Sequence, residues 1–242
     1  MPKKILVMYS NEAASSGHLE RLGALASDWE VVAARNAKMA VEHAPDVQII
    51  LGHRYLRQVL RHSSKIKWVQ STAAGIEHLI DDRLLKFAPM LSRCPIFSET
   101  IALHALTLAM AVTRRIPAAV LAQAERRWLS QSEILPIDQP HTAMVIGMGG
   151  IGQELGKRLK AQTIHVIGVT KNTTPPTDCF DELIFASAWK NRLPEVDWCF
   201  LAIPESPDNH RFFDQVAIES LHARAVLVNV GRASTLDQQA LL

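Results

Sequence analysis

The sequence predicts an α/β protein of two domains, each built on a parallel β-sheet flanked by helices on both faces. Short apolar runs rich in branched side chains alternate with amphipathic stretches of helical period. This alternation occurs twice, once on each side of a long apolar segment that is itself expected to be helical. We therefore expect the domains to comprise residues 1–98 and 99–242, with the boundary near residues 96–100.

Four apolar runs in the first domain have the length and the branching of buried strands. They are Ile5–Tyr9, Glu30–Ala33, Val47–Leu51 and Trp68–Ser71. The stretches between them are expected to form amphipathic helices over His18–Ala26, Ala37–His43 and Leu56–His62. Pro89 and Pro95 then interrupt the pattern, which indicates the end of this domain.

A long helix is expected over Glu99–Trp128. Its first half is apolar on nearly every side, which predicts burial, and Pro117 is expected to kink or interrupt it. Residues 130–140 hold two prolines and are expected to form a surface connection. The expected strands of the second domain are Thr142–Ile146, His165–Thr170, Leu183–Phe185, Trp198–Ile203 and Ala225–Val230. Its expected helices are Gln153–Ala161, Ser187–Leu193 and Gln215–Leu221.

The composition is ordinary for a globular protein, with 48% hydrophobic and 21% charged residues and a net charge of +2. This charge gives no reason to expect nucleic acid or a membrane surface as a partner. No apolar run reaches the roughly 18 residues of a membrane helix, and the N-terminal run is too short for a signal peptide, so a cytoplasmic location is expected. Cys94, Cys179 and Cys199 are far apart, so we expect no zinc or other metal site and no disulfide framework.

A glycine-rich turn is expected between a strand and a helix at the start of the second domain. Its glycines follow the pattern GxGxxG over Gly147-Met148-Gly149-Gly150-Ile151-Gly152. Gly147 permits the tight turn, Gly149 lets the backbone approach a pyrophosphate, and Gly152 permits close packing of the helix on the strand. The helix N-terminus offers free N–H groups and a positive dipole to the anion. This context predicts a dinucleotide site in a Rossmann domain, although a glycine-rich turn that binds nothing remains an alternative.

The residues at the end of the second strand of this domain bear on which cofactor binds. NAD sites usually place an acid there for the ribose 2′-hydroxyl. This sequence has Thr170, Lys171 and Asn172 instead, and a lysine beside hydroxyl groups suits a 2′-phosphate. NADP(H) is therefore favoured over NAD(H), the alternative being a polar loop whose lysine faces water.

Several segments, in order along nearly the whole chain, resemble the D-isomer-specific 2-hydroxyacid dehydrogenases. They are Lys67–Leu79 (KWVQSTAAGIEHL), Arg114–Pro117 (RRIP) with Trp128, Leu201–Asn209 (LAIPESPDN) and Ala225–Asp237 (AVLVNVGRASTLD). The ending Thr170-Lys171-Asn172 and the compact length are similar to the glyoxylate/hydroxypyruvate reductase branch. The resemblance implies two Rossmann- or flavodoxin-like domains and a homodimer formed through the long helix.

The resemblance also implies a reaction, the reversible transfer of a hydride between a nicotinamide and the C2 carbon of a small 2-keto or 2-hydroxy acid. Arg232 then matches the catalytic arginine that binds the substrate, and a surface ion pair is the alternative for this side chain. The backbone amides of Ala74, Gly75 and Ile76 are expected to hold the substrate carboxylate. The residues expected to line the nicotinamide side are Ala202, Ile203, Pro204, Val230 and Gly231.

The sequence departs from the family pattern after Arg232. The family's proton donor is a histidine paired with a glutamate beyond this arginine, and neither residue type follows Arg232 here. His53, His78 and His104 lie nearer the expected cleft, but none is assigned as the acid. We therefore expect a copy of the enzyme that lacks the C-terminal part of the fold, the alternative being a non-catalytic nucleotide-binding protein.

Overall fold

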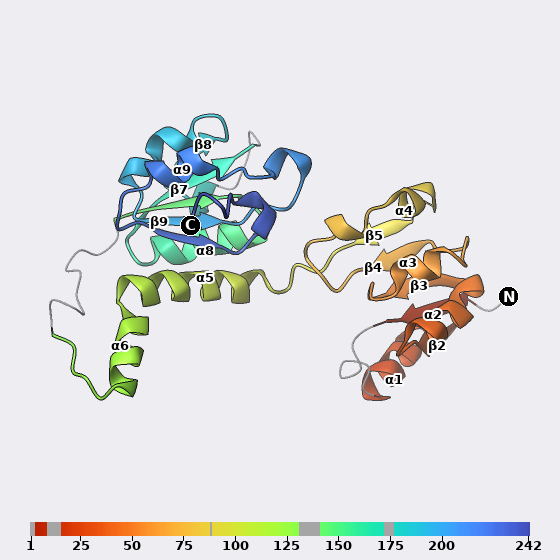
Figure 1. Cartoon of the computed structure of the whole chain (residues 1–242). Helices are drawn as coiled ribbons and strands as arrows, with labels where there is room; N and C mark the ends of the chain where they lie inside the picture. The colour runs from red at the N-terminus through yellow and green to blue at the C-terminus, as the bar shows by residue number, and fades with distance from the viewer. Residues whose placement is uncertain (1–2, 9–15, 88, 131–140, 172–176) are drawn as a thin grey trace. The chain divides into compact units, whose positions relative to one another are not determined.

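The computed structural model describes residues 3–8, 16–87, 89–130, 141–171 and 177–242. The chain divides into two compact units, Met1–Ile96 and Phe97–Leu242. The first unit ends two residues before the expected domain boundary. Each unit contains a five-stranded sheet in which every neighbouring pair of strands is parallel (Figure 1). The predicted fold class is therefore confirmed.

The sheet of the first unit has the strand order β2-β1-β3-β4-β5. Its strands are β1 (Lys3–Val7), β2 (Trp29–Ala33), β3 (Val47–Leu51), β4 (Trp68–Gln70) and β5 (Met90–Ser92). The helices are α1 (Ser16–Leu25), α2 (Ala37–His43), α3 (Leu56–Leu60) and α4 (Asp82–Phe87), with short 3-10 turns η1 (Ala44–Asp46) and η2 (Glu77–Leu79). The four predicted strands are confirmed with small shifts at their ends, and Tyr9 lies outside the described residues. β5 was not predicted, because three residues flanked by Pro89 and Pro95 carry too short a pattern.

The apolar strand residues of the first unit meet the helices in one core. Leu6, Ile50 and Val69 are fully buried, from three adjacent strands. Ala40 of α2 and Val59 of α3 are buried in the same cluster. The carboxyl ends of β3 and β4 are consequently held side by side, in a register that pairs Leu51 with Gln70.

The sheet of the second unit has the strand order β10-β9-β6-β7-β8. Its strands are β6 (Thr142–Ile146), β7 (His165–Thr170), β8 (Glu182–Phe185), β9 (Trp198–Leu201) and β10 (Val226–Asn229). Its helices include α5 (Ser98–Thr113), α6 (Ile116–Ala124), α8 (Gly150–Lys160) and α9 (Gln215–Ser220). Short 3-10 turns are η3 (Thr177–Cys179), η4 (Trp189–Glu195), η5 (Pro207–Asn209) and η6 (Ala233–Thr235). From β6 the chain adds β7 and β8 on one side of the sheet, and then β9 and β10 on the other side. The strand order therefore reverses between β6 and β9, which is where open α/β sheets bind their ligands.

Two helix predictions for the second unit need correction. The expected helix at Ser187–Leu193 is instead the 3-10 segment η4, which contains Pro194 and so lacks one backbone donor. The expected helix over Glu99–Trp128 is two helices, α5 and α6, bent by 65°. Arg115 takes a positive φ of 52° at the break, and Pro117 lies in the first turn of α6. The interruption expected at Pro117 is therefore confirmed; at that position a helix does not need the missing N–H, so the proline begins α6 rather than kinking one continuous helix.

α5 buries one side rather than its whole surface, contrary to the prediction. Ala102, Ala105 and Ala109 are fully buried where α5 packs against α8 and β10 (Figure 1). Leu103 and Leu108 are 51% and 41% exposed on the other side. In the described part of the chain no single helix has the length and hydropathy to cross a membrane, and the bent pair of α5 and α6 meets that test by length and composition only.

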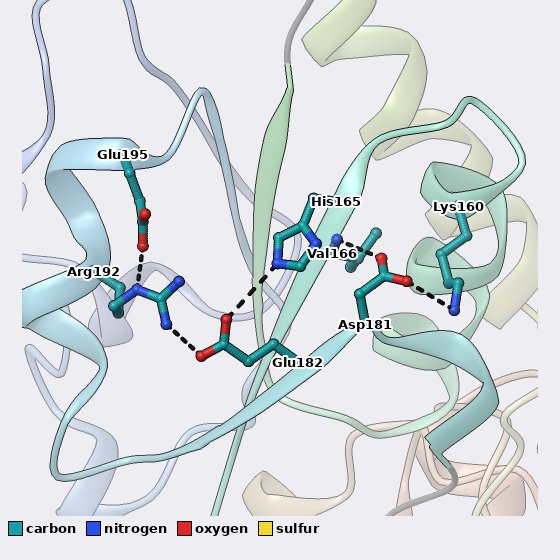
Figure 2. Close-up of polar contacts among 7 residues, drawn as sticks. All are labelled: Lys160, His165, Val166, Asp181, Glu182, Arg192 and Glu195. Carbon is teal, nitrogen blue, oxygen red and sulfur yellow. Dashed lines mark hydrogen bonds and ion pairs between the residues drawn. The ribbon is translucent and has the colours of Figure 1, made fainter.

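A polar network fastens the edge strand β8 to its neighbours, as Figure 2 shows. One Asp181 oxygen accepts a hydrogen bond from Val166 N at 2.8 Å, and the other lies 3.0 Å from Lys160 Nζ. Arg192 contacts both Glu182 and Glu195. The network thereby joins the end of α8, the start of β7, the start of β8 and the segment η4.

Replacing Asp181 by alanine is expected to lower the free energy of unfolding by about 1–3 kcal/mol at pH 7, because the N–H of buried Val166 loses its acceptor. Burial alone would raise the pKa of Asp181, but the Val166 N–H and Lys160 outweigh burial and lower this pKa below 3.8. The carboxylate therefore stabilises the fold above the unfolded pKa, and this contribution is lost as the pH falls through the lowered folded value. Urea unfolding should show a difference from the natural protein that is largest near neutral pH and shrinks below about pH 4. The exposed Asp178→Ala is the matched control, and an equal loss in both variants would contradict the prediction.

Candidate functional site

The glycine-rich turn joins β6 to α8 at the point where the sheet order reverses. Gly147 has a φ of 101°, in the region that favours glycine. A Cβ atom on Gly147 would lie 2.7 Å from the carbonyl oxygen of Ala202 and 2.8 Å from Cγ2 of Ile203. The turn is thus packed against the loop that follows β9, and two sets of predicted cofactor residues lie together.

The other glycines of the turn differ in how much space surrounds them. A Cβ on Gly152 would overlap the carbonyl oxygen of Gly147, so this glycine allows α8 to pack closely on β6. A Cβ on Gly150 would lie 2.6 Å from Oγ of Ser98. A Cβ on Gly149 would meet nothing within 4 Å. The backbone is therefore tightly packed on one side of the turn and open at Gly149, as an approaching pyrophosphate requires.

α8 begins at Gly150, and Ile151 follows in its first turn. The N-cap residue, Gly149, has no side chain to accept from the first N–H groups of the helix. The helix is 11 residues long and carries no acid in its first turn, whereas Lys157, Arg158 and Lys160 lie in its last turn. Its N-terminus is therefore a positive end without a side-chain cap, which suits a phosphate group.

Lys171 follows β7 and is tied to the loop after β9. Its Nζ donates to Oδ1 of Asn209 at 3.1 Å and lies 3.8 Å from Oδ2 of Asp208. Asn209 is 6% exposed, and its Nδ2 donates to the carbonyl oxygen of Pro204 at 2.9 Å. Of the other residues expected here, Thr170 ends β7, and Asn172 lies outside the described residues. Sequence reasoning missed Asp208 and Asn209, since nothing in the spacing of residues 171 and 209 indicates their contact.

The ends of β9 and β10 bring together the residues expected on the nicotinamide side. Ala202 and Ile203 directly follow β9, and Val230 N donates to the carbonyl oxygen of Leu201 at 3.0 Å. A Cβ on Gly231 would lie 2.5 Å from the carbonyl oxygen of Ile203, so the two loops are in close contact. This closeness explains a glycine at position 231.

Arg232 is exposed and lies just beyond the carboxyl end of β10. Asn229 fixes the backbone on both sides of it: Oδ1 accepts from Gly231 N at 2.9 Å, and Nδ2 donates to the carbonyl oxygen of Arg232 at 3.0 Å. The hydroxyl of Thr235, which is fully buried, donates to the same carbonyl oxygen at 2.7 Å. The arginine thus has an anchored backbone and an exposed side chain, as a residue that meets a soluble anion needs.

In the first unit, the loop after β4 holds the residues expected to bind a carboxylate. Ser71 is fully buried, and its Oγ accepts from Ala73 N at 3.0 Å. The carbonyl oxygen of Ala73 in turn accepts from Cys94 N at 3.0 Å. Within the described ranges, no acceptor is bonded to the backbone N–H groups of Ala74, Gly75 and Ile76, which are half-buried. Successive backbone donors of this kind suit an anion.

A histidine stands beside this loop. His53 comes two residues after β3, and its Nδ1 is 3.0 Å from Oγ of Ser71 and 3.5 Å from Oγ1 of Thr72. The ring of His78 lies edge-on at 5.5 Å between ring centroids. Burial, and then the neighbouring His78, lower the pKa of His53 below 6.5. The contact of His53 with Ser71 was not expected from the sequence.

Comparisons with known proteins agree with this geometry. The family model described as "D-isomer specific 2-hydroxyacid dehydrogenase, NAD binding domain" matches residues 106–242, more than half of the chain. The D-3-phosphoglycerate dehydrogenase of Mycobacterium tuberculosis is 25% identical over 189 residues, which are 76% of this chain and 35% of that protein. The glyoxylate reductase of Thermococcus litoralis is 24% identical over 197 residues, which are 77% of this chain and 58% of that protein.

The fold has close counterparts among solved structures. A D-isomer specific 2-hydroxyacid dehydrogenase family protein from Aeromonas salmonicida superposes with a TM-score of 0.85 at 23% identity. The superposition covers all of this chain and 76% of that one. The family match and the glycine turn at the reversal point of the sheet support the same assignment, and the chain belongs to the D-isomer specific 2-hydroxyacid dehydrogenase family.

Proposed function

We propose that the chain belongs to an NADP(H)-dependent reductase of small 2-keto acids, with glyoxylate or hydroxypyruvate as substrate and the corresponding 2-hydroxy acid as product, of D configuration where C2 becomes a stereocentre. Residues 1–98 act as the substrate domain and residues 99–242 as the cofactor domain. The observation that carries the proposal is Arg232, whose backbone is anchored at the same sheet edge as the glycine turn. The relatives of known activity that the chain resembles include a glyoxylate reductase.

The residues present fit a dinucleotide. The open space at Gly149 and the uncapped start of α8 are where a pyrophosphate would be held. Ala202, Ile203 and Pro204, together with Val230 and Gly231, would lie on the nicotinamide side. When bound, the cofactor supplies the hydride. The chain's own residues bind the nucleotide, orient it and fix the substrate.

The chain supplies two kinds of group for a 2-keto acid. Arg232 offers a permanent cation whose forked donors can bind a carboxylate and polarise a carbonyl oxygen, which favours hydride transfer to the C2 carbon. Ala74, Gly75 and Ile76 offer backbone N–H groups to the carboxylate. Neither group contacts the substituent on C2, so we propose both glyoxylate and hydroxypyruvate as substrates.

The decisive experiment is the oxidation of NADPH by the purified chain with glyoxylate and with hydroxypyruvate, followed at 340 nm and repeated with NADH. Turnover that prefers NADPH supports the proposed reductase. Binding of NADPH, seen as a change in its fluorescence, without oxidation favours the second candidate, a non-catalytic nucleotide-binding protein. That candidate is kept because no histidine in the described residues is assigned as the proton donor. Failure to bind either cofactor would overturn both.

Replacing Lys171 by alanine is expected to raise the Kd for NADPH about 10- to 100-fold, because a charge-assisted hydrogen bond to the 2′-phosphate is lost. The Kd for NADH should change less than about threefold, since NADH lacks this phosphate. Asp208→Asn should have the opposite effect and tighten NADPH, because the carboxylate beside Lys171 repels the phosphate. Lys157→Ala, in the last turn of α8, is the matched control. An equal weakening of both cofactors in Lys171→Ala would contradict the NADPH preference.

A homodimer is proposed as the working assembly, formed through α5 and α6. These helices expose apolar side chains that are 41–65% accessible: Leu103, Leu108, Val112, Ile116, Val120 and Leu121. Sedimentation equilibrium should give about twice the chain mass of 26.8 kDa, and Leu121→Glu should shift the mass towards the monomer. Leu25→Glu is the control, because Leu25 is 85% exposed on α1 of the other unit. A monomer at all concentrations would overturn the assembly.

A further inference from the structure

The carboxyl ends of β3 and β4 place a titratable side chain, His53, against Ser71 and Thr72, which lead into the loop of backbone donors at residues 74–76. Gly52 N donates to the carbonyl oxygen of Gln70 at 2.8 Å, which fixes the start of one loop on the end of the neighbouring strand. His53 and Ser71 follow directly, with 3.0 Å between Nδ1 and Oγ. Ser71 Oγ also accepts from Ala73 N, so one buried hydroxyl joins the imidazole to the backbone that leads into residues 74–76.

This hydroxyl can bond the imidazole in either protonation state. With neutral His53, the Ser71 hydroxyl donates to an unprotonated Nδ1 and still accepts from Ala73 N. With the imidazolium, Nδ1–H donates to Oγ, which has a second lone pair for Ala73 N–H. A change of charge on His53 therefore needs only a rotation of the hydroxyl, and the loop keeps its hydrogen bonds.

We propose that His53 is the proton-accepting positioning residue of the carboxylate loop, and that it becomes an imidazolium when a small carboxylate binds to the N–H groups of residues 74–76. The inference rests on the proposed function, because it takes this loop as the carboxylate site. An anion bound to this loop, beside the Ser71 hydroxyl that His53 contacts, favours the charged form of the histidine, whereas burial without an anion favours the neutral form. The proton taken up would give His53 a positive charge, which would attract the carboxylate in addition to the backbone N–H dipoles of residues 74–76.

Four other titratable or charged side chains among the described residues surround His53. The ring of His78 lies on η2, with 5.5 Å between the ring centroids. Arg57 of α3 donates to the carbonyl oxygen of His78 at 2.9 Å and lies 3.8 Å from Asp81. Glu77, beside His78, adds a negative charge on the same turn. The pKa of His53 is lowered by burial first and by His78 second, and a negative charge bound at the loop would shift this pKa in the opposite direction.

The test measures oxamate binding to the full chain by isothermal titration, with and without saturating NADPH. Oxamate is used because it carries one carboxylate and does not titrate between pH 5.5 and 8. Repeating the titration in buffers of different ionisation enthalpy gives the number of protons taken up. We expect an uptake that approaches one proton per oxamate near neutral pH, and a Kd that rises by up to about tenfold per pH unit as the pH increases.

His53→Asn is the decisive variant, because the asparagine amide can take the place of Nδ1 toward Ser71 but does not titrate. It should abolish the proton uptake and leave a weaker, pH-independent Kd. His62→Gln, an exposed histidine after α3, is the matched control and should behave as the natural protein does. The NMR titration of the His53 ring in the natural protein gives a check without any substitution, and its pKa should rise when oxamate is added.

Three outcomes would overturn the inference. Oxamate could bind with the same Kd from pH 6 to 8 and with no proton uptake. Uptake could persist in His53→Asn and vanish in His78→Gln, which would assign the proton to His78. No oxamate binding at any pH, while NADPH still binds, would overturn the carboxylate loop itself. That last result is the failure of the proposed substrate site and is distinct from the first two.

Discussion

Replacing Arg232 by alanine is expected to lower kcat/KM for glyoxylate about 10²- to 10³-fold, the usual effect of removing one donor to a developing oxyanion. The substitution removes the cation but leaves the loop intact, because the bonds of Asn229 and Thr235 are to the backbone of residues 231 and 232. The free energy of unfolding should therefore change by less than about 0.5 kcal/mol. The measurement is steady-state reduction of glyoxylate at saturating NADPH.

Two further variants make the Arg232 result specific. Arg232→Lys should recover only part of the activity, because an ammonium keeps the charge but lacks the forked pair of donors. Arg224→Ala, before the opposite end of β10, changes the net charge equally and should keep full activity. Loss of activity in Arg224→Ala equal to that in Arg232→Ala would point to charge alone, and full activity of Arg232→Ala would remove this arginine from the site.

The second large effect concerns three of the four glycines of the cofactor turn, which should respond to alanine in two ways. Gly147→Ala is expected to destabilise the fold by about 2–5 kcal/mol, because its positive φ and its contacts with Ala202 and Ile203 both oppose a Cβ. Gly152→Ala should be similarly damaging through overlap with the Gly147 carbonyl. Gly149→Ala should stay within about 1 kcal/mol of the natural protein, because its Cβ meets open space.

The Kd for NADPH should distinguish Gly149, which we propose to lie against the cofactor, from Gly147 and Gly152, which are needed for packing. Gly149→Ala should raise the Kd for NADPH at least about tenfold in a chain that unfolds normally, because the methyl group occupies space that the pyrophosphate needs. Urea unfolding and NADPH fluorescence, measured on the same samples, distinguish the two classes. Normal NADPH affinity in Gly149→Ala would mean that the open side of the turn is not where the pyrophosphate lies.

The long elements were predictable because their patterns are local. The strand ranges Val47–Leu51, Thr142–Ile146 and His165–Thr170 agree with the structure residue for residue. Each of the first two lies between a polar residue and a glycine, and the third begins and ends with a polar residue. β5 escaped prediction because a three-residue strand is defined by its pairing with β4, which local sequence does not encode. The exposed side of α5 was mispredicted because an apolar sequence alone does not tell which face another element covers.

The parts of the candidate site that carry a sequence motif or a family resemblance were predictable, whereas contacts between distant residues were not. The GxGxxG spacing located the turn, and the structure places Gly147 against Ala202 and Ile203. The contacts of Lys171 with Asn209, and of His53 with Ser71, join residues 38 and 18 positions apart. Such pairs depend on which strand ends are neighbours in the sheet, so they become visible only once the strand order is known.

The buried amide of Asn209 has a consequence for protein engineering. Its oxygen holds Lys171 and its nitrogen holds the Pro204 carbonyl, so one side chain serves both loops. A library that varies only position 171 to change cofactor choice would remove the hydrogen bond to that amide oxygen, whereas the bond from the amide nitrogen to Pro204 remains. If Lys171 contributes to cofactor choice as proposed, the side chain that positions it contributes too, so positions 171 and 209 are best randomised as a pair.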